Sequence, residues 1–214
     1  MTRAAERLRT ILDQIAAAAA LAGRDPSGVQ LIAVSKGRPA DEIEPLIEAG
    51  QRDFGENRVQ EALAKWPALL DRYPDLRLHE IGRLQSNKAA EAAQLFETIH
   101  SLDRRSLLDA LVKTDKTPSV YVQVNIGEEE QKGGCAIADV GELVEAVRAS
   151  SLPLAGLMAI PPLGVEPAPY FALLAELARR HDVSGLSIGM SADFKAAVML
   201  GATAVRVGTA LFED

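Results

Sequence analysis

Cysteine and histidine are scarce in this sequence, and each scarcity excludes a class of protein. The single cysteine, Cys135, cannot form an intramolecular disulfide. Only three histidines are present and they are widely spaced, so we expect no Cys/His metal cage and no metal site. The formal net charge is −7, and no stripe of lysine and arginine interrupts the acidic balance. Both features argue against nucleic acid as the main ligand.

The sequence also lacks a long hydrophobic run. Near the N-terminus the longest uncharged stretch, residues 14–23, is rich in alanine and too short to span a bilayer. Charged residues are interleaved with Leu8, Ile11 and Ile15, a pattern unlike that of a signal peptide. The helical spacing of these apolar residues predicts an amphipathic helix that ends at Gly23. We therefore expect a cytoplasmic protein without membrane contact.

The remaining composition is that of an ordinary globular protein, with 48% hydrophobic and 25% charged residues. A chain of 214 residues buries roughly 70% of its unfolded surface and needs no disulfide or metal for stability. No internal repeat or linker divides the sequence. We predict one domain over residues 1–214.

Short β-rich runs alternate with amphipathic helical stretches after the N-terminal helix. The predicted strands are 29–35, 52–55, 76–82, 98–102, 119–126, 154–160, 185–189 and 204–207. The predicted helices between them are 42–49, 57–71, 87–95, 104–112, 139–150, 167–181 and 192–200. This alternation is the (β/α)₈ pattern, so we predict an α/β protein with a compact TIM barrel and an extra N-terminal helix. An open doubly wound sheet is the alternative.

Lys36 follows the first predicted strand, within the sequence AVSKG. The functional site of a parallel barrel lies at the carboxyl ends of its strands. A lysine that emerges from an apolar strand is expected to be partly desolvated, which favours the neutral, nucleophilic amine. Such an amine forms a Schiff base with an aldehyde. The alternative is a surface lysine that merely opens a loop.

The segments after the seventh and eighth predicted strands indicate an anion site. Ser191 is a natural N-cap for a helix beginning near Ala192, whose free N–H groups attract an anion. Gly208 and Thr209 follow the last strand. The loops after strands seven and eight commonly hold a phosphate in TIM barrels. Alternatively, Ser191 only caps a helix and Gly208 only turns the chain.

Arg206 interrupts an apolar strand that is expected to be buried on both faces. A buried guanidinium needs an acceptor. A carboxylate from a neighbouring strand is one candidate, and the ring nitrogen or phosphate of a ligand is the other. A lysine, a phosphate site and an arginine around one barrel mouth together fit pyridoxal 5′-phosphate (PLP).

Three further residues are weaker candidates. Asn57 follows the second predicted strand and either binds the ligand or caps the next helix. Met158 comes late in the sixth strand and packs around a ligand or in the barrel core. His79 either lines the mouth of the barrel or lies in the core with its hydrogen bonds satisfied.

Seven motifs occur in order along the chain and together resemble those of a known family. They are AVSKG (33–37), FGENRVQE (54–61), HEIGRLQSNK (79–88), VNIGEEEQKGG (124–134), GLMAIPP (156–162), LSIGMSADF (186–194) and RVGTALF (206–212). The sequence resembles the pyridoxal phosphate homeostasis protein family, relatives of the barrel domain of alanine racemase. Glu80 departs from that pattern, because relatives often have a bulky apolar residue there. We expect Glu80 to change the surface beside His79 and not to touch the Schiff base.

The resemblance implies a fold-type III PLP barrel in which Lys36 is the Schiff-base lysine. By the same matching, Ser191, Gly208 and Thr209 hold the phosphate and Arg206 faces the pyridine nitrogen. The residues that the resemblance places around the cofactor are Lys36, Asn57, Met158, Ser191, Arg206, Gly208 and Thr209.

The resemblance also implies that the protein is a carrier of PLP. It assigns no residue a catalytic role. A racemase needs a second acid–base group, which alanine racemases take from a tyrosine of an additional β-domain, and 214 residues leave no room for that domain. The tyrosines of this chain, Tyr73, Tyr121 and Tyr170, are expected away from the mouth. We therefore expect a monomer that binds PLP reversibly, maintains intracellular PLP and passes it to apo-enzymes. A small PLP-dependent amino-acid racemase is the alternative.

Overall fold

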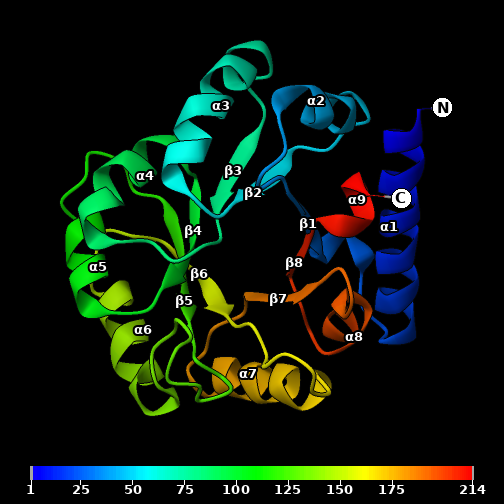
Figure 1. Cartoon of the computed structure of the whole chain (residues 1–214). Coiled ribbons are helices and arrows are strands. Elements are labelled where there is room, and N and C mark those ends of the chain that lie inside the picture. The colour runs from blue at the N-terminus through cyan, green and yellow to red at the C-terminus, as the bar shows by residue number, and fades with distance from the viewer. Residues whose placement is uncertain (1, 214) are drawn as a thin grey trace.

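A computed structural model describes residues 2–213, in which the strands close into a parallel barrel surrounded by helices (Figure 1). Neighbouring strands follow the order of the chain from β1 to β8, and β8 pairs with β1. The predicted (β/α)₈ barrel is confirmed, and the closed pairing excludes the open doubly wound sheet.

The predicted elements are all present, with small shifts at their ends. The strands are β1 (Gln30–Val34), β2 (Asp53–Glu56), β3 (Arg77–Glu80), β4 (Thr98–Leu102), β5 (Ser119–Gln123), β6 (Leu154–Met158), β7 (Leu186–Met190) and β8 (Ala204–Val207). The helices are α1 (Arg3–Leu21), α2 (Ala40–Glu48), α3 (Val59–Arg72), α4 (Ala89–Leu95), α5 (Arg105–Leu111), α6 (Val140–Arg148), α7 (Ala168–Arg180), α8 (Phe194–Met199) and α9 (Thr209–Phe212). The short helix α9 was not predicted.

The N-terminal helix α1 packs against the end of the chain. Its buried residues are Leu8, Ile11, Ile15, Ala18 and Ala19, which recur at helical spacing as the sequence predicts. In Figure 1 this helix lies beside α8 and α9, and it also contacts α2. The helix therefore covers the part of the barrel where the first and last strands meet.

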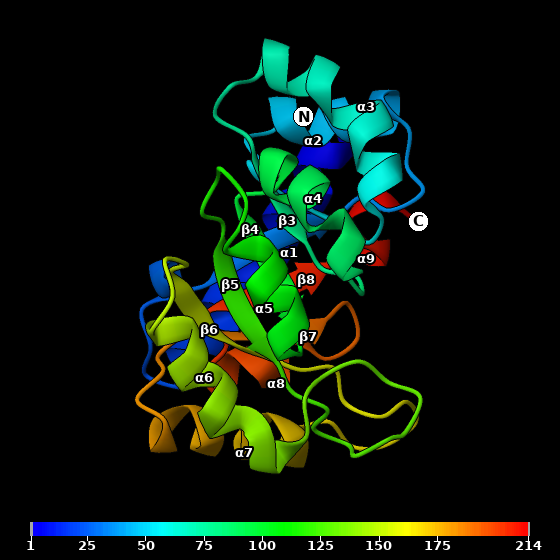
Figure 2. The same cartoon turned by 90° about the vertical axis from the view of Figure 1, so that its left-hand side faces the viewer.

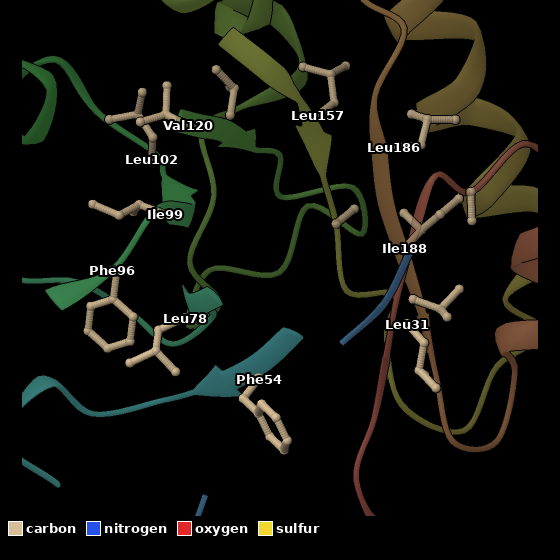
Figure 3. Packing of buried hydrophobic residues seen from close by; sticks show 14 of the residues in the cluster. Leu31, Phe54, Leu78, Phe96, Ile99, Leu102, Val120, Leu157, Leu186 and Ile188 are labelled. Carbon is tan, nitrogen blue, oxygen red and sulfur yellow. The ribbon is translucent and has the colours of Figure 1, made fainter. Parts of the chain in front are cut away.

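Apolar side chains fill the layer between the strands and the surrounding helices. Phe54, Leu78 and Ile99 come from the consecutive strands β2, β3 and β4 and are buried together (Figure 3). Phe54 contacts Trp66 of α3, with 5.1 Å between the ring centroids. Because side chains alternate between the two faces of a strand, the residues on either side of Phe54 and Leu78 point into the barrel.

The loops at the carboxyl ends of the strands form the face that carries the site. Those that follow β5 and β6 extend side by side (Figure 2), and Lys132 donates a 3.2 Å hydrogen bond to the carbonyl of Pro161. Within residues 2–213, no helix is long and apolar enough to cross a membrane.

Packing of α1 against the barrel predicts a large difference between two neighbouring substitutions. Ile15→Ala removes a side chain that is 2% exposed, whereas Leu12→Ala removes one that is 45% exposed. We expect I15A to lower the free energy of unfolding by about 2–4 kcal/mol, and L12A to lower it by less than about 1 kcal/mol. Urea unfolding followed by circular dichroism measures both. Equal losses would contradict the packing described for α1.

Candidate functional site at the carboxyl ends of the strands

A cavity of about 480 Å³ lies at the carboxyl ends of the strands, where the two ends of the barrel sheet meet. This volume lies within the range of roughly 300–1,000 Å³ that is usual for small-molecule sites. The predicted residues that line the cavity are Lys36, Asn57, Ser191, Arg206, Gly208 and Thr209. The structure therefore brings together residues from both halves of the chain.

Lys36 lies two residues beyond β1 and lines the cavity. Its side chain is exposed, so the expected partial burial is wrong. Within residues 2–213 the amine has no hydrogen-bond or ion-pair partner, which leaves it free to react with a ligand in the cavity.

A buried ion pair anchors the backbone on both sides of Lys36. The Lys65 ammonium lies 2.6 Å from the fully buried Glu56 carboxylate and donates 3.0 Å hydrogen bonds to the carbonyls of Ser35 and Arg38. The Ser35 hydroxyl donates to the same carboxylate at 2.7 Å. These contacts hold the loop in place while the Lys36 side chain stays unattached. Sequence analysis did not find this support, because Glu56 and Lys65 come from different elements.

Arg206 lies in β8 and is 4% exposed. Its guanidinium donates to the Ser187 carbonyl at 2.8 Å, the Ser187 hydroxyl at 2.6 Å and the Ala159 carbonyl at 3.1 Å. Among the residues described, no carboxylate forms an ion pair with it, so the alternative of a carboxylate partner is wrong. Burial lowers the pKa of Arg206 to about 10, and the group is still charged at neutral pH. Three of its five N–H donors are used, which leaves two for a ligand.

Ser191 and Gly208 join the loops that follow β7 and β8. The Ser191 hydroxyl accepts a 3.2 Å hydrogen bond from the Gly208 N–H. Helix α8 begins at Phe194, two residues later than predicted, and Asp193 occupies its N-cap position. Ser191 is therefore not the N-cap, and the prediction of that role is wrong. Its hydroxyl instead holds together two loops of the cavity wall.

Two glycines allow close approach around these loops, Gly189 between β7 and α8 and Gly208 between the loop after β8 and the end of β1. Gly189 has φ +93°, and a Cβ there would lie 2.5 Å from the Cβ of Ala197. A Cβ on Gly208 would lie 3.2 Å from the carbonyl oxygen of Val34, at the end of β1. A side chain at Gly189 would push α8 away from β7, and one at Gly208 would push the cavity wall away from β1.

Asn57 leaves a buried oxygen without a partner. Helix α3 begins at Val59 with Arg58 in the N-cap position, so the alternative in which Asn57 caps this helix is wrong. The Asn57 Oδ1 atom is buried and accepts no hydrogen bond from the described residues. A buried polar atom without a partner is costly, and this one belongs to a residue that lines the cavity.

Met158 and His79 do not line the cavity within the described structure. Met158 is fully buried at the end of β6, which agrees with the packing alternative. His79 is buried in β3 with both ring nitrogens in hydrogen bonds, so it is the satisfied core histidine.

Several residues of the cavity wall were not predicted from the sequence. Ile81 and Ile160 come just after β3 and β6, and Met190 and Phe212 complete the apolar part of the wall. Both residues fall at the carboxyl ends of the predicted strands 76–82 and 154–160, so the last residues of each predicted strand would have indicated them.

Glu80 is buried, so the expectation that it changes the surface beside His79 is wrong. The residue is 1% exposed. Its carboxyl group accepts hydrogen bonds from the Ser101 hydroxyl at 2.7 Å and the Gly82 N–H at 3.0 Å. Burial raises the pKa of Glu80 to about 8, although both hydrogen bonds act to lower it.

An exposed lysine, a buried arginine without a carboxylate partner and the two loops joined by Ser191 and Gly208 at one mouth define a TIM-barrel protein built to hold an anionic small molecule. The model of the family "Alanine racemase, N-terminal domain" matches residues 7–214. The chain is 42% identical to the pyridoxal phosphate homeostasis protein of Pseudomonas aeruginosa, over 99% of this chain and 96% of that protein. It is 41% identical to the protein of the same name from Aquifex aeolicus, over 99% and 98% of the two chains. The chain belongs to the pyridoxal phosphate homeostasis protein family, within the group built on the alanine racemase N-terminal domain.

Solved structures agree with this assignment. PipY of Synechococcus elongatus, solved with PLP bound, is 41% identical and has a TM-score of 0.82, over 98% of this chain and all of that one. Alanine racemase of Corynebacterium glutamicum is 19% identical with a TM-score of 0.64, over 94% of this chain and 60% of that one. That second likeness concerns the fold alone.

The buried Glu80 carboxyl predicts that stability falls as the pH rises. Between about pH 4.5 and pH 8 the folded protein keeps Glu80 protonated while the unfolded chain ionises it, so folding takes up a proton. We expect the free energy of unfolding to decrease across this interval and the contribution of Glu80 to level off above it. Glu80→Gln should make the decline shallower. Urea titrations of both proteins from pH 5 to pH 9 measure it, and identical slopes would show that Glu80 is ionised in the folded state.

Proposed function

We propose that this protein binds PLP, holds it reversibly through a covalent bond to Lys36 and serves PLP homeostasis as a carrier without catalytic turnover. The observation that carries the proposal is that two groups without a carboxylate partner, an amine and a guanidinium, line the same cavity. The Lys36 amine has no partner among residues 2–213, and the buried Arg206 cation has no carboxylate partner there. A ligand with an aldehyde and an acceptor atom would satisfy both.

The polar groups of PLP have matching residues in this cavity. The ring nitrogen of PLP is an acceptor, and two N–H groups of Arg206 remain for it. The phosphate matches the wall formed by Ser191, Gly208 and Thr209, where the first turn of α9 presents N–H groups without intrahelical acceptors. The unpartnered Asn57 oxygen supports a donor on the ligand nearby. Met158 remains a prediction as a packing residue behind this site.

PLP supplies an aldehyde carbon with which a primary amine forms a covalent C=N bond. The residues of this chain would hold and orient it. Arg206 stays charged at neutral pH and would donate to the ring nitrogen, which keeps that nitrogen unprotonated and weakens the ring as an electron sink. Apolar side chains of Ile81 and Ile160 would cover the ring.

The placement of the tyrosines supports a carrier over the alternative racemase. Tyr73 bonds to Glu44 at 2.8 Å beside α3, and Tyr121 is buried in β5, stacked on His100. Tyr170 lies in α7. Within residues 2–213 none of these hydroxyls lines the cavity, so the site lacks the tyrosine acid–base group that a racemase of this fold uses. PLP bound at this site would then be released to apo-enzymes without being used in a reaction here.

Lys36→Ala tests the covalent bond. We expect wild-type protein to gain an absorbance band near ~420 nm with PLP, and borohydride reduction to label Lys36 in peptide mass mapping. K36A should lose both signals while keeping its circular dichroism spectrum, because the residue is exposed beyond the end of a strand. Lys113→Ala, which removes an exposed lysine after α5, is the matched control and should behave as wild type. A label on another lysine would remove Lys36 from the proposed role.

Exchange of the α-proton separates a carrier from a racemase. PLP-loaded protein is incubated with L-alanine or D-alanine in D₂O, and the loss of the α-proton signal is followed by NMR. We expect no exchange above that of free PLP. Exchange at an enzymatic rate that disappears in K36A would replace the carrier proposal with the racemase.

A further inference from the structure

Five polar side chains from five strands form a continuous hydrogen-bonded chain through the interior of the barrel. Arg206 donates to Ser187 Oγ at 2.6 Å, and Ser187 Oγ lies 2.9 Å from His100 Nδ1. His100 Nε2 lies 3.0 Å from His79 Nδ1, and His79 Nε2 lies 3.1 Å from Asp53 Oδ1. Strands β4 and β7 are not neighbours, so the bond from Ser187 to His100 crosses the interior. We name this set of five residues the core chain.

The end of the core chain farthest from the cavity is a carboxylate. Asp53 begins β2, at the opposite end of the barrel from the cavity, and accepts two 2.7 Å hydrogen bonds from Arg77. Gln30 donates a further one at 2.8 Å. Burial opposes ionisation of Asp53, but the hydrogen bonds from Arg77 and His79 outweigh it and lower the pKa to about 2. At neutral pH this carboxylate can only accept.

With a single ring proton on each histidine, an acceptor at this end decides which atom donates at every other link. His79 Nε2 then donates to Asp53, so His79 Nδ1 accepts from His100 Nε2. The Nδ1 atom of His100 then accepts the proton of the Ser187 hydroxyl. Burial is the main reason that the pKa of His100 is well below its ordinary value, which agrees with the neutral ring this order requires.

The order of donors has a consequence for Arg206. Since the Ser187 hydroxyl gives its proton to His100, its lone pairs face the guanidinium. Ser187 then fixes Arg206 through two acceptors, its hydroxyl and its carbonyl. Arg206 lines the cavity, and two of its N–H groups have no acceptor among the described residues. A buried polar network is favourable only when each member is satisfied, and both histidines of this one are.

We propose that Asp53, His79, His100 and Ser187 are positioning residues for Arg206. Through the core chain they hold the guanidinium in the orientation that presents its two remaining N–H groups to a ligand in the cavity. The inference rests on the proposed function only in taking PLP as that ligand. Residues at the far end of the barrel thereby contribute to the affinity of a site that they do not touch.

The tautomers of the two histidines test the order of donors without any ligand. In ¹⁵N-labelled wild-type protein at neutral pH, long-range ¹H–¹⁵N spectra distinguish a protonated ring nitrogen from an unprotonated one. We expect both His79 and His100 to carry their proton on Nε2. A proton on Nδ1 of His100 would overturn the proposal, because the Ser187 hydroxyl would then accept from both His100 and Arg206 and its own proton would have no acceptor in the core chain.

Substitutions of His100 test the effect on the site. His100→Leu interrupts the core chain and should weaken PLP binding by about tenfold, the effect expected when the freed Ser187 hydroxyl turns and loses its hydrogen bond to the charged Arg206. His100→Gln keeps an N–H for His79 and a carbonyl oxygen for Ser187, and should restore most of the affinity. Tyr121→Phe keeps the ring stacked on His100 and is the matched control, with an affinity within twofold of wild type.

The affinities are compared only for variants whose circular dichroism shows a folded barrel. Asp53→Asn is a second way to disturb the order of donors, and should weaken PLP binding and alter the His100 tautomer together. Wild-type PLP affinity in folded H100L and D53N would overturn the proposal while leaving PLP binding intact. Absence of PLP binding in wild type would refute the proposed function instead, and the tautomers would still report on the core chain.

Discussion

The pairing of the first strand with the last is the constraint on which the rest of this structure depends. In the register of β1 and β8, Ile32 lies opposite Arg206 and Ala33 opposite Val207. This closure leaves the sheet without an exposed edge. It also places Lys36, which follows β1, beside Gly208 and Thr209, which follow β8. Residues from the two ends of the sequence thus share one cavity wall, and helix α1 covers the junction from outside (Figure 1).

A second constraint is the burial of positive charge below the cavity. Arg206 is satisfied by carbonyl and hydroxyl oxygens instead of a carboxylate, so its charge is solvated within the barrel but not neutralised by direct contact. A carboxylate ion pair at this place would compete with an anionic ligand. The nearest part of the core chain is neutral, and its carboxylate, Asp53, lies at the other end of the barrel and is paired with Arg77. This separation keeps the Arg206 cation available to the cavity.

Local sequence patterns were sufficient for the elements and for much of the site. The alternation of strands and helices predicted the barrel, and the residues that follow the strands predicted Lys36, Ser191 and Gly208 on the cavity wall. Where a pattern allowed two local roles, it was less reliable. Ser191 suits an N-cap by residue type, yet helix α8 begins later and Asp193 takes that position. Asn57 likewise suits a cap, but Arg58 precedes α3.

The sequence by itself determined the architecture, because side-chain periodicity and capping residues act over a few positions and need no distant partner. It also determined which residue types stand at the strand ends. Only the tertiary structure decided which partner each polar residue found. Glu80 became a buried carboxyl, and His79 and His100 came into contact, because closing the barrel brings side chains from different strands to one interior. Those contacts join residues far apart in the chain, and their geometry follows from the register and tilt of all the strands together.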